Sequence, residues 1–216
     1  MNKIPEKILI VSKSGDGKTT SARNLDKNTT GFINAEYKTL PFDKDFKHHS
    51  LPTTWEEVYN AMIEFGKNDE IKVVFLDSLS AYLEMLMAYA RKTKSGYNIF
   101  SYYNEQVSKF LTLIKRYPKT LFITAHYEWV NEEGGVPEKR VKTKGNEWKS
   151  VIEKEFSMVI YGGVEIDAIN KQREYRFYLH TDGTNSAKTP PRIFGPEVEY
   201  IDNDCQIILN ALNKKK

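Results

Sequence analysis

Cysteine, long apolar runs and an excess of charge of one sign are nearly absent from the 216 residues of this sequence. A single cysteine, Cys205, excludes an internal disulfide framework and a multi-cysteine zinc site, and it fits a reducing compartment. The apolar run at residues 8–11 is too short for a signal peptide, and no run approaches the length of a membrane span. We therefore expect a cytoplasmic protein with no membrane partner.

The balance of charge constrains the partners very little. The chain has 32 Lys and Arg against 29 Asp and Glu, which gives a formal net charge of +3. This value neither requires nor excludes a polyanionic partner, so only local clusters of basic residues can indicate whether there is one. Hydrophobic residues make up 40% and charged residues 28%, a composition typical of a soluble globular protein.

Short apolar runs alternate with helical patterns in the first part of the chain. Strands are predicted at residues 8–11, 31–36, 72–77 and 120–126, and helices at residues 19–25, 53–68, 80–91 and 103–117. The second helix begins with a capping box, Thr54 with Glu57, and continues with Val58, Met62 and Phe65 at helical spacing. This alternation predicts an α/β fold, with a mostly parallel sheet flanked by helices.

The pattern changes after residue 126. Residues 127–149 contain a Gly-Gly turn, a proline, few apolar residues and many charges, so we predict a long exposed loop. The β-rich runs at residues 157–167 and 174–182 are predicted to form antiparallel strands toward the C-terminus. Residues 202–212 are predicted to form a short helix before a lysine tail. With no internal repeat, residues 1–216 are expected to form a single domain.

The run ILIVSKSGDGKTTSA, at residues 8–22, has the form of a phosphate-binding loop between a strand and a helix. Ser12 replaces the first glycine of the pattern G-x-x-x-x-G-K-[ST], a position that demands less of the backbone than the others. Lys18 would reach the β- and γ-phosphates, and Thr19 would hold Mg²⁺. The residues expected to bind the nucleotide are Ser14, Gly15, Asp16, Gly17, Lys18, Thr19 and Thr20. The alternative is a strand–turn–helix corner that happens to contain Gly-Lys-Thr.

Three polar residues end the strands that follow this loop. Asp77 ends KVVFLD, at a position where a P-loop protein has a residue that supports Mg²⁺. An aspartate after a strand is also a common helix cap, but Ser78 is the better candidate for the cap here. Glu36 ends GFINAE, where it could activate a water for attack on the γ-phosphate, and a solvated surface glutamate is an equal alternative. His126 ends LFITAH, where it could contact the γ-phosphate or the water, or serve as a structural hydrogen bonder.

The phrases SKSGDGKTT, FINAE, VVFLDSLSA and LFITAH resemble, in order and spacing, the core of RecA-type ATPases. The resemblance implies a RecA-like P-loop NTPase core with ATP and Mg²⁺ as ligands, Glu36 as the general base and Asp77 in the second acidic motif. His126 stands where RecA has a glutamine that links the γ-phosphate to a DNA-binding loop. The short chain is similar to minimal RecA-fold proteins of bacteriophages, which include single-strand annealing proteins and would act in the host cytoplasm.

In a RecA-like core, the loops after the Asp77 helix and after the His126 strand face DNA. The first loop offers Arg91, Lys92 and Lys94 with the aromatic residues Tyr97, Phe100, Tyr102 and Tyr103. The second offers Lys139, Arg140, Lys142, Lys144 and Lys149 with Trp148. Cations for phosphates and rings for stacking suit single-stranded DNA without sequence choice. The alternative is that the lysines are only solvated and that the aromatic residues belong to the core.

Lys188 and Arg192 flank the Pro-Pro pair of SAKTPPRIF. RecA-type proteins assemble as rings or filaments with ATP between subunits, and a cation from a neighbouring subunit can stabilise the charge of the transition state. The resemblance therefore implies a homo-oligomer in which Lys188 or Arg192 reaches the ATP of the next copy. A rigid turn with solvated basic neighbours is the alternative.

Together these features predict a DNA-stimulated ATPase that binds single-stranded DNA and promotes annealing or strand exchange in recombination and repair, with a single-strand binding protein as a further partner. Two alternatives stay open. A P-loop kinase acting on a small acceptor would need an arginine-rich lid, which the sequence does not obviously contain. A non-catalytic, nucleotide-dependent module, such as a loader for a helicase or single-strand binding protein, would show negligible hydrolysis.

Overall fold

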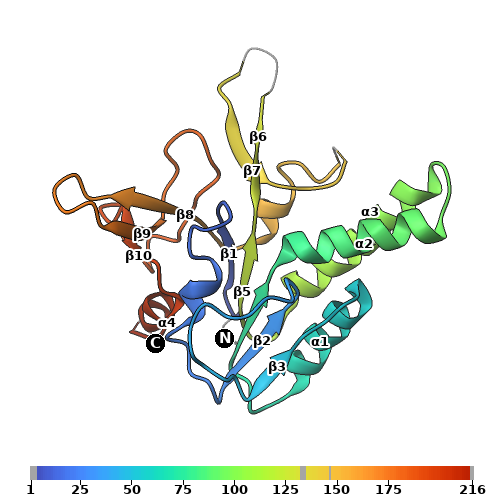
Figure 1. Cartoon of the computed structure of the whole chain (residues 1–216), viewed down its shortest axis with the longest axis horizontal. Helices are drawn as coiled ribbons and strands as arrows, with labels where there is room; N and C mark the ends of the chain where they lie inside the picture. The colour runs from blue at the N-terminus through green and yellow to red at the C-terminus, as the bar shows by residue number, and fades with distance from the viewer. Residues whose placement is uncertain (1–3, 132–134, 146, 215–216) are drawn as a thin grey trace.

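The computed structural model describes residues 4–131, 135–145 and 147–214 of the chain. In this part, an eight-stranded sheet has the strand order β10-β9-β8-β1-β5-β4-β2-β3 (Figure 1). Its strands are β1 (Lys7–Val11), β2 (Thr30–Asn34), β3 (His48–Ser50), β4 (Val73–Asp77), β5 (Thr120–Ala125), β8 (Met158–Ile166), β9 (Arg173–Tyr178) and β10 (Tyr200–Asp202). A separate hairpin consists of β6 (Tyr127–Val130) and β7 (Glu138–Val141). The helices are α1 (Trp55–Lys67), α2 (Leu79–Thr93), α3 (Asn98–Lys115) and α4 (Cys205–Lys214), with the 3₁₀ helices η1 (Thr19–Ala22) and η2 (Ile152–Glu155).

The strand β1 lies inside the sheet and pairs in parallel with β5 on one side and β8 on the other. Beyond β5, the strands β4, β2 and β3 continue the parallel arrangement. Beyond β8, the strands β9 and β10 extend the sheet in antiparallel pairing. This confirms the predicted α/β architecture: a mostly parallel sheet flanked by helices, with antiparallel strands toward the C-terminus.

Both faces of the sheet are covered, so every residue of β1 is buried. Because side chains alternate along a strand, Leu9 and Val11 join a core with residues of α1, α2 and α3. Ile8 and Ile10 join the opposite core, with residues of η1 and α4. Figure 1 shows α1, α2 and α3 on one side of the sheet and α4 on the other.

The predicted helix starts are confirmed at two places. At α1, Thr54 Oγ1 accepts a hydrogen bond from the Glu57 N–H, and the Glu57 carboxylate accepts one from the Thr54 N–H. At α2, the Ser78 hydroxyl accepts a hydrogen bond from the Ala81 N–H. Since Ser78 caps α2, the neighbouring Asp77 carboxylate is left for another role.

The predicted helix at residues 19–25 is wrong in its length. Only η1, four residues of 3₁₀ helix, forms after the phosphate loop. Threonine and serine in this segment are weak helix formers. The carboxylate of Asp26 then accepts hydrogen bonds from the N–H groups of Asn28 and Thr29, which closes a turn before β2.

The predicted exposed loop at residues 127–149 is also wrong in part, because it contains the β6–β7 hairpin. Antiparallel pairing runs from Tyr127 with Val141 to Val130 with Glu138. Tyr127 and Val141 contact the core that includes α2 and α3, and this burial anchors the base of the hairpin. Residues 132–134 and 146 of the predicted loop lie outside the described residues, as do the tail lysines at 215 and 216.

The two edges of the sheet are short. The strands β3 and β10, which form these edges, have three residues each. In the part of the chain that the structure describes, no helix has the length and apolarity needed to cross a membrane.

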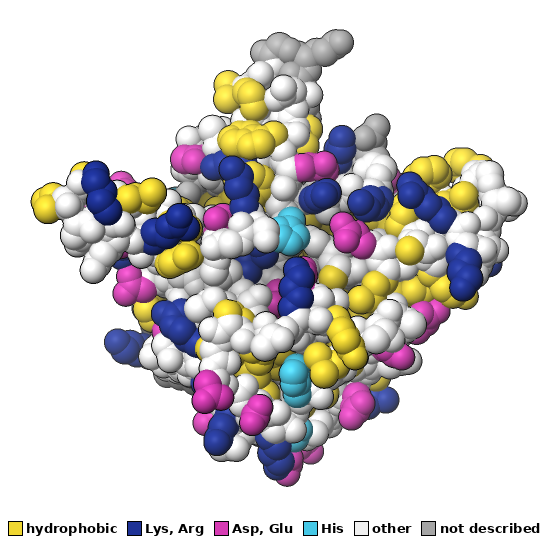
Figure 2. Space-filling model, viewed as in Figure 1, with side chains coloured by type: hydrophobic (Ala, Val, Ile, Leu, Met, Phe, Trp, Pro, Cys, Tyr) yellow, Lys and Arg dark blue, Asp and Glu magenta, His cyan; other side chains and the backbone are white. Residues whose placement is uncertain are grey.

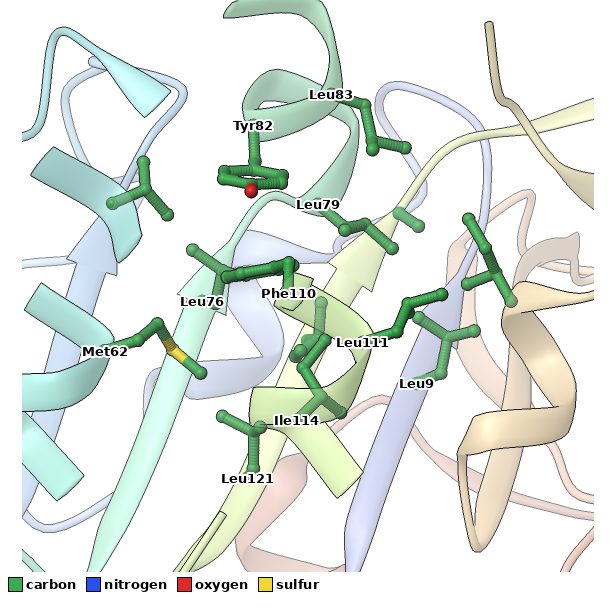
Figure 3. Packing of buried hydrophobic residues seen from close by; sticks show 14 of the residues in the cluster. Leu9, Met62, Leu76, Leu79, Tyr82, Leu83, Phe110, Leu111, Ile114 and Leu121 are labelled. Carbon is green, nitrogen blue, oxygen red and sulfur yellow. The ribbon is translucent and has the colours of Figure 1, made fainter. Parts of the chain in front are cut away.

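The core between the sheet and α1–α3 should depend strongly on one aromatic pair. Phe110 is 1% exposed, and its ring stacks on that of Tyr82 with centroids 4.0 Å apart (Figure 3). Phe110→Ala is expected to lower the free energy of unfolding in urea by about 3–5 kcal/mol, because it leaves a cavity. Tyr97→Ala, at a side chain that is 84% exposed, should change it by less than about 0.5 kcal/mol. Equal losses of unfolding free energy in the two variants would contradict the importance of the Phe110–Tyr82 pair for this core.

Candidate nucleotide-binding and catalytic site

One edge of the sheet collects the residues that the sequence singled out. Because β1, β2, β4 and β5 are parallel, their carboxyl ends lie at the same edge. Lys18 follows β1, Glu36 follows β2, Asp77 ends β4 and His126 follows β5. All four line one cavity of about 670 Å³, a size typical of ligand sites. Figure 2 shows a hollow near the middle of this face, beside a histidine and several Lys and Arg side chains.

The loop after β1 has the backbone of a phosphate cradle. Gly15 and Gly17 have φ angles of +88° and +81°, in the left-handed region that glycine adopts without strain. Of the seven residues predicted to bind the nucleotide, all but one line the cavity: Ser14, Gly15, Gly17, Lys18, Thr19 and Thr20. Asp16 does not, because its carboxylate accepts a hydrogen bond from the Lys13 N–H at 3.0 Å and closes the turn of the loop.

The electrostatics of this cradle depend on Lys18 more than on a helix. Since η1 has only four residues, the field of a helix dipole at the loop is smaller than a full helix would provide. Lys18 is 8% exposed, and its Nζ donates to the carbonyl oxygens of Ser12 and Lys13 at 3.1 and 2.7 Å. Burial lowers the pKa of Lys18, and the nearby Asp77 opposes this shift.

Ser12 replaces the first glycine of the motif and is accommodated by another glycine. Ser12 is fully buried, and a Cβ added to Gly162 of β8 would lie 3.0 Å from the Ser12 Cβ. The missing side chain at Gly162 therefore leaves space for the serine. The loop keeps its glycines at the positions with positive φ, where they are needed.

Thr19 and Asp77 have the chemistry of a magnesium site. The Thr19 hydroxyl donates to Asp77 Oδ2 at 2.5 Å, and the Thr124 hydroxyl donates to Oδ1 at 2.5 Å. Burial raises the pKa of Asp77, and the hydrogen bonds from Thr124 and Thr19 oppose this shift. Magnesium is usually held by one or two carboxylates together with phosphate oxygens, and a hydroxyl and a carboxylate beside the phosphate cradle fit that pattern. Within the described ranges, no cluster of three or more His, Cys, Asp or Glu could hold a metal ion.

Glu36 has three polar neighbours. Ser78 Oγ donates to its Oε1 at 2.6 Å, Lys38 Nζ donates to its Oε2 at 2.6 Å, and His126 Nε2 lies 3.8 Å from Oε1. The His126 ring, followed by Lys38 and Ser78, holds the pKa of Glu36 well below its ordinary value, although burial acts against them. The carboxylate is therefore ionised, the charge state from which it could accept a proton from water.

His126 lies between the phosphate cradle and Glu36. Its Nδ1 is 3.3 Å from Lys18 Nζ, and its backbone N–H donates to the Ser80 hydroxyl at 2.9 Å. Its carbonyl oxygen accepts a hydrogen bond from the Lys142 N–H at 2.8 Å. His126 thus lines the cavity of about 670 Å³, the candidate nucleotide cavity, and also belongs to the backbone at the base of the β6–β7 hairpin.

The sequence missed the remaining walls of the cavity. These are formed by Arg23, Asn34, Lys38, Thr39, Pro41, Tyr175, Asp202 and Asn203. The Asn203 amide donates to the Asp16 carbonyl at 3.3 Å, so the turn between β10 and α4 braces the phosphate loop. Tyr175 lies close to Gly17, at which a Cβ would be 3.1 Å from the tyrosine ring. Arg23, Asn34, Lys38, Thr39 and Pro41 lie within five residues of a predicted site residue, but no motif marks them. Tyr175, Asp202 and Asn203 are far from the predicted residues in the chain.

The second group of predicted DNA contacts follows His126 and is carried by the hairpin. Lys139 and Arg140 belong to β7, and Lys142 and Lys144 follow it. Three of these cations have acidic neighbours: Lys139 with Asp182, Arg140 with Glu138, and Lys144 with Glu84. Trp148 is not a free stacking ring, since it packs against the core and its Nε1 donates to Asn104.

The first group of predicted DNA contacts lies at the far end of α2 and α3. Arg91 and Lys92 are exposed in the last turn of α2, and Lys94 lies over the ring of Tyr102 at 4.8 Å. The expected loop is short, because α3 already begins at Asn98. Tyr103 is fully buried and belongs to the core, whereas Tyr97 and Phe100 are exposed.

Lys188 and Arg192 do not line the nucleotide cavity of their own chain. The backbone of Lys188 pairs with Val159, and Arg192 forms an ion pair with the buried Glu6. Burial lowers the pKa of Lys188, and Glu153 opposes this shift. Contact with ATP would therefore require a second copy of the chain.

The phosphate cradle, the buried Lys18 and the acids at the strand ends are together the features of a P-loop NTPase. A family model described as AAA domain matches residues 4–190, and the chain belongs to this family. Among solved structures, a KaiC-like protein from the hyperthermophilic archaeon Pyrococcus horikoshii OT3 is similar, with 16% sequence identity and a TM-score of 0.48. That match covers 86% of this chain and 85% of the other. A search of curated proteins gives no significant match.

The contact between Ser12 and Gly162 can be tested by paired substitutions. Gly162→Ala is expected to displace the phosphate loop, to lower the free energy of unfolding by about 1–3 kcal/mol and to weaken binding of a fluorescent ATP analogue. Adding Ser12→Gly should restore both, because it removes the atoms that the new Cβ meets. Urea unfolding and fluorescence titration of the single and double variants measure this coupling. If the two substitutions act additively, the contact does not position the loop.

Proposed function

We propose that this chain is an ATPase that binds single-stranded DNA and promotes its annealing or strand exchange in recombination and repair. The observation that carries the proposal is that His126 contacts both the phosphate loop and the β6–β7 hairpin. Its ring lies 3.3 Å from Lys18 Nζ, where a γ-phosphate would be held, and its carbonyl oxygen bonds the Lys142 N–H. A nucleotide that shifts this residue would also shift the hairpin, which begins at the next residue.

The hairpin has the side chains that a single strand requires. Lys139 lies over the rings of Trp129 and Tyr127, at 5.3 and 5.9 Å, and Trp129 is 53% exposed. Figure 2 shows Lys and Arg side chains gathered between the base of the hairpin and the α2–α3 pair. DNA phosphates could replace the carboxylates that pair with these cations, because those carboxylates are exposed to water and ion pairs at the surface are weak. Rings would then stack with bases irrespective of sequence.

Hydrolysis is the activity that the nucleotide cavity supports best. Backbone N–H groups of the loop and Lys18 would bind the phosphates, and Thr19 with Asp77 would hold Mg²⁺, which neutralises phosphate charge when bound. Glu36 would accept a proton from the attacking water. His126 would respond to the presence of the γ-phosphate.

We further propose that the chain assembles on DNA as a ring or filament, alongside a single-strand binding protein. Support for this comes from the resemblance to RecA-type proteins. In such an assembly Lys188 or Arg192 could reach the ATP of the next copy, and Arg192 would first have to leave Glu6.

An ATPase titration with and without single-stranded DNA tests the proposal. We expect hydrolysis that DNA stimulates and that Lys18→Ala lowers at least about 100-fold, because a main phosphate contact is lost. Glu36→Gln should still bind ATP but lose turnover by about 10²–10⁴-fold, because the base is missing. Lys27→Ala, at an exposed lysine outside the cavity, is the matched control. Negligible hydrolysis by the unaltered chain would instead favour the non-catalytic loader.

The link through His126 makes a separate prediction. With ATPγS, the unaltered chain should bind a fluorescent oligothymidylate about 5–150-fold more tightly than with ADP, the usual range of allosteric coupling. His126→Ala should remove this difference, although ATPγS still binds. Lys142→Ala should weaken DNA binding with either nucleotide and reduce the slope of log K against log salt by about 0.7. A His126→Ala chain that keeps the full nucleotide effect would exclude this route.

A second candidate function, phosphoryl transfer to a small acceptor, has one observation in its favour. A cavity of about 520 Å³ adjoins the nucleotide cavity and shares Glu36, Lys38 and His126 with it. An acceptor hydroxyl there would lie beside Glu36. Analysis of the products of the same titration separates the candidates, because only a kinase yields a phosphorylated small molecule in place of inorganic phosphate.

A further inference from the structure

Lys38 is a cation at the phosphate end of the cavity that none of the sequence motifs includes. Its side chain is 72% exposed, and its Nζ lies 2.6 Å from Glu36 Oε2. Together with Glu36 and His126, it lines both the nucleotide cavity and the adjoining cavity of about 520 Å³. These three side chains therefore form the wall between the two spaces.

The backbone after β2 is arranged so that Lys38 turns back toward Glu36. The buried Asn34 amide donates to the Lys38 carbonyl oxygen at 2.7 Å, and the Tyr37 N–H donates to the Asn34 carbonyl oxygen at 3.2 Å. Tyr37 has a φ of +53°, a region that residues other than glycine rarely adopt. The Tyr37 side chain is 62% exposed, so packing of the ring does not account for this conformation. What the turn achieves is the placement of Lys38.

The charges at this end of the cavity give Lys38 a reason to move when ATP binds. A γ-phosphate beside Lys18 would bring several negative charges near the Glu36 carboxylate, which repels them. The Lys38 side chain is 72% exposed and that of Glu36 is 18% exposed, so water reaches the ammonium and it can exchange one anion for another. While Lys38 remains on Glu36, it also weakens this carboxylate as a base, because it stabilises the ionised form.

We propose that Lys38 is a catalytic cation of the same chain, which leaves Glu36 when ATP binds and contacts the γ-phosphate. This inference rests on the proposed ATP hydrolysis. In that step the water oxygen bonds to the γ-phosphorus, the bond from phosphorus to the bridging oxygen breaks, and ADP takes the electron pair. Glu36 accepts the proton of the water, and Lys38 stabilises the charge on the phosphoryl oxygens. Unlike Lys188 or Arg192, it needs no second copy of the chain.

Binding without turnover gives the sharpest test. Isothermal titration with Mg²⁺ and either ATPγS or ADP would compare the unaltered chain with Lys38→Met, Lys38→Arg and Lys47→Met. Lys38→Met is expected to weaken ATPγS binding about 10-fold and ADP binding less than about twofold, because one charge-assisted hydrogen bond to the γ-phosphate is lost. Lys38→Arg should keep most of the preference for ATPγS. Lys47 is the matched control, since it also pairs with a glutamate, Glu70 at 2.9 Å, but lies outside both cavities.

The steady-state rate of each variant completes the test. Lys38→Met should lower kcat at least about 10-fold, with an unchanged unfolding midpoint. Equal loss of ATPγS and ADP affinity, no loss of either, or a higher kcat would overturn the inference, and a higher kcat would mean that Lys38 only masks Glu36. If the unaltered chain hydrolyses no ATP but Lys38→Met still loses its preference for ATPγS, the proposed hydrolysis fails and the phosphate contact stands. If the unaltered chain shows DNA-stimulated hydrolysis and Lys38→Met keeps its preference for ATPγS over ADP, the proposed hydrolysis stands and the contact of Lys38 with the γ-phosphate fails.

Discussion

The parallel pairing of β1 on both of its sides is the constraint on which the site depends. Val11, the last residue of β1, pairs with Ala125 of β5 and with Tyr161 of β8. The next residues along these strands are Ser12, His126 and Gly162, which are thereby placed side by side. A shift of β1 by one residue would exchange its two buried faces and separate the loop from both neighbours. Two complete cores, one on each face, prevent that shift.

The charged groups of the cavity already compensate one another in the free protein. Lys18 is bonded to backbone carbonyls, Asp77 accepts hydrogen bonds from two threonine hydroxyls, and Glu36 is paired with Lys38. Burying such groups without partners would be costly. A phosphate or a metal ion would therefore enter the cavity by replacing existing contacts of these charged groups. The free energy of binding is the difference between the contacts with the ligand and the contacts that it replaces, so small changes in either set alter the affinity.

Local patterns in the sequence were sufficient for the parallel strands β1, β2, β4 and β5 and for the residues at their ends. An apolar strand followed by Gly-Lys-Thr, or ended by an acid, is readable within ten residues, and parallel strands then bring such ends together. The far walls of the cavity were not readable, because Tyr175 and Asn203 reach it only through the antiparallel extension of the sheet. The hairpin was missed for a different reason: its charged residues mask a period of two that only the pairing with Tyr127–Val130 reveals. Lys38 lacked a signal because a tight turn, and not a motif, places it.

The short edges of the sheet limit how copies of this chain could associate. A long, flat edge strand offers unpaired N–H and C=O groups, and chains can join through it as one continuous sheet. Here β3 and β10 present only three residues each. In the assembly proposed above, neighbouring copies would therefore be held by contacts between side chains. Side-chain contacts of this kind could break and form again each time a nucleotide is exchanged, whereas a shared sheet would first have to lose the hydrogen bonds between its strands.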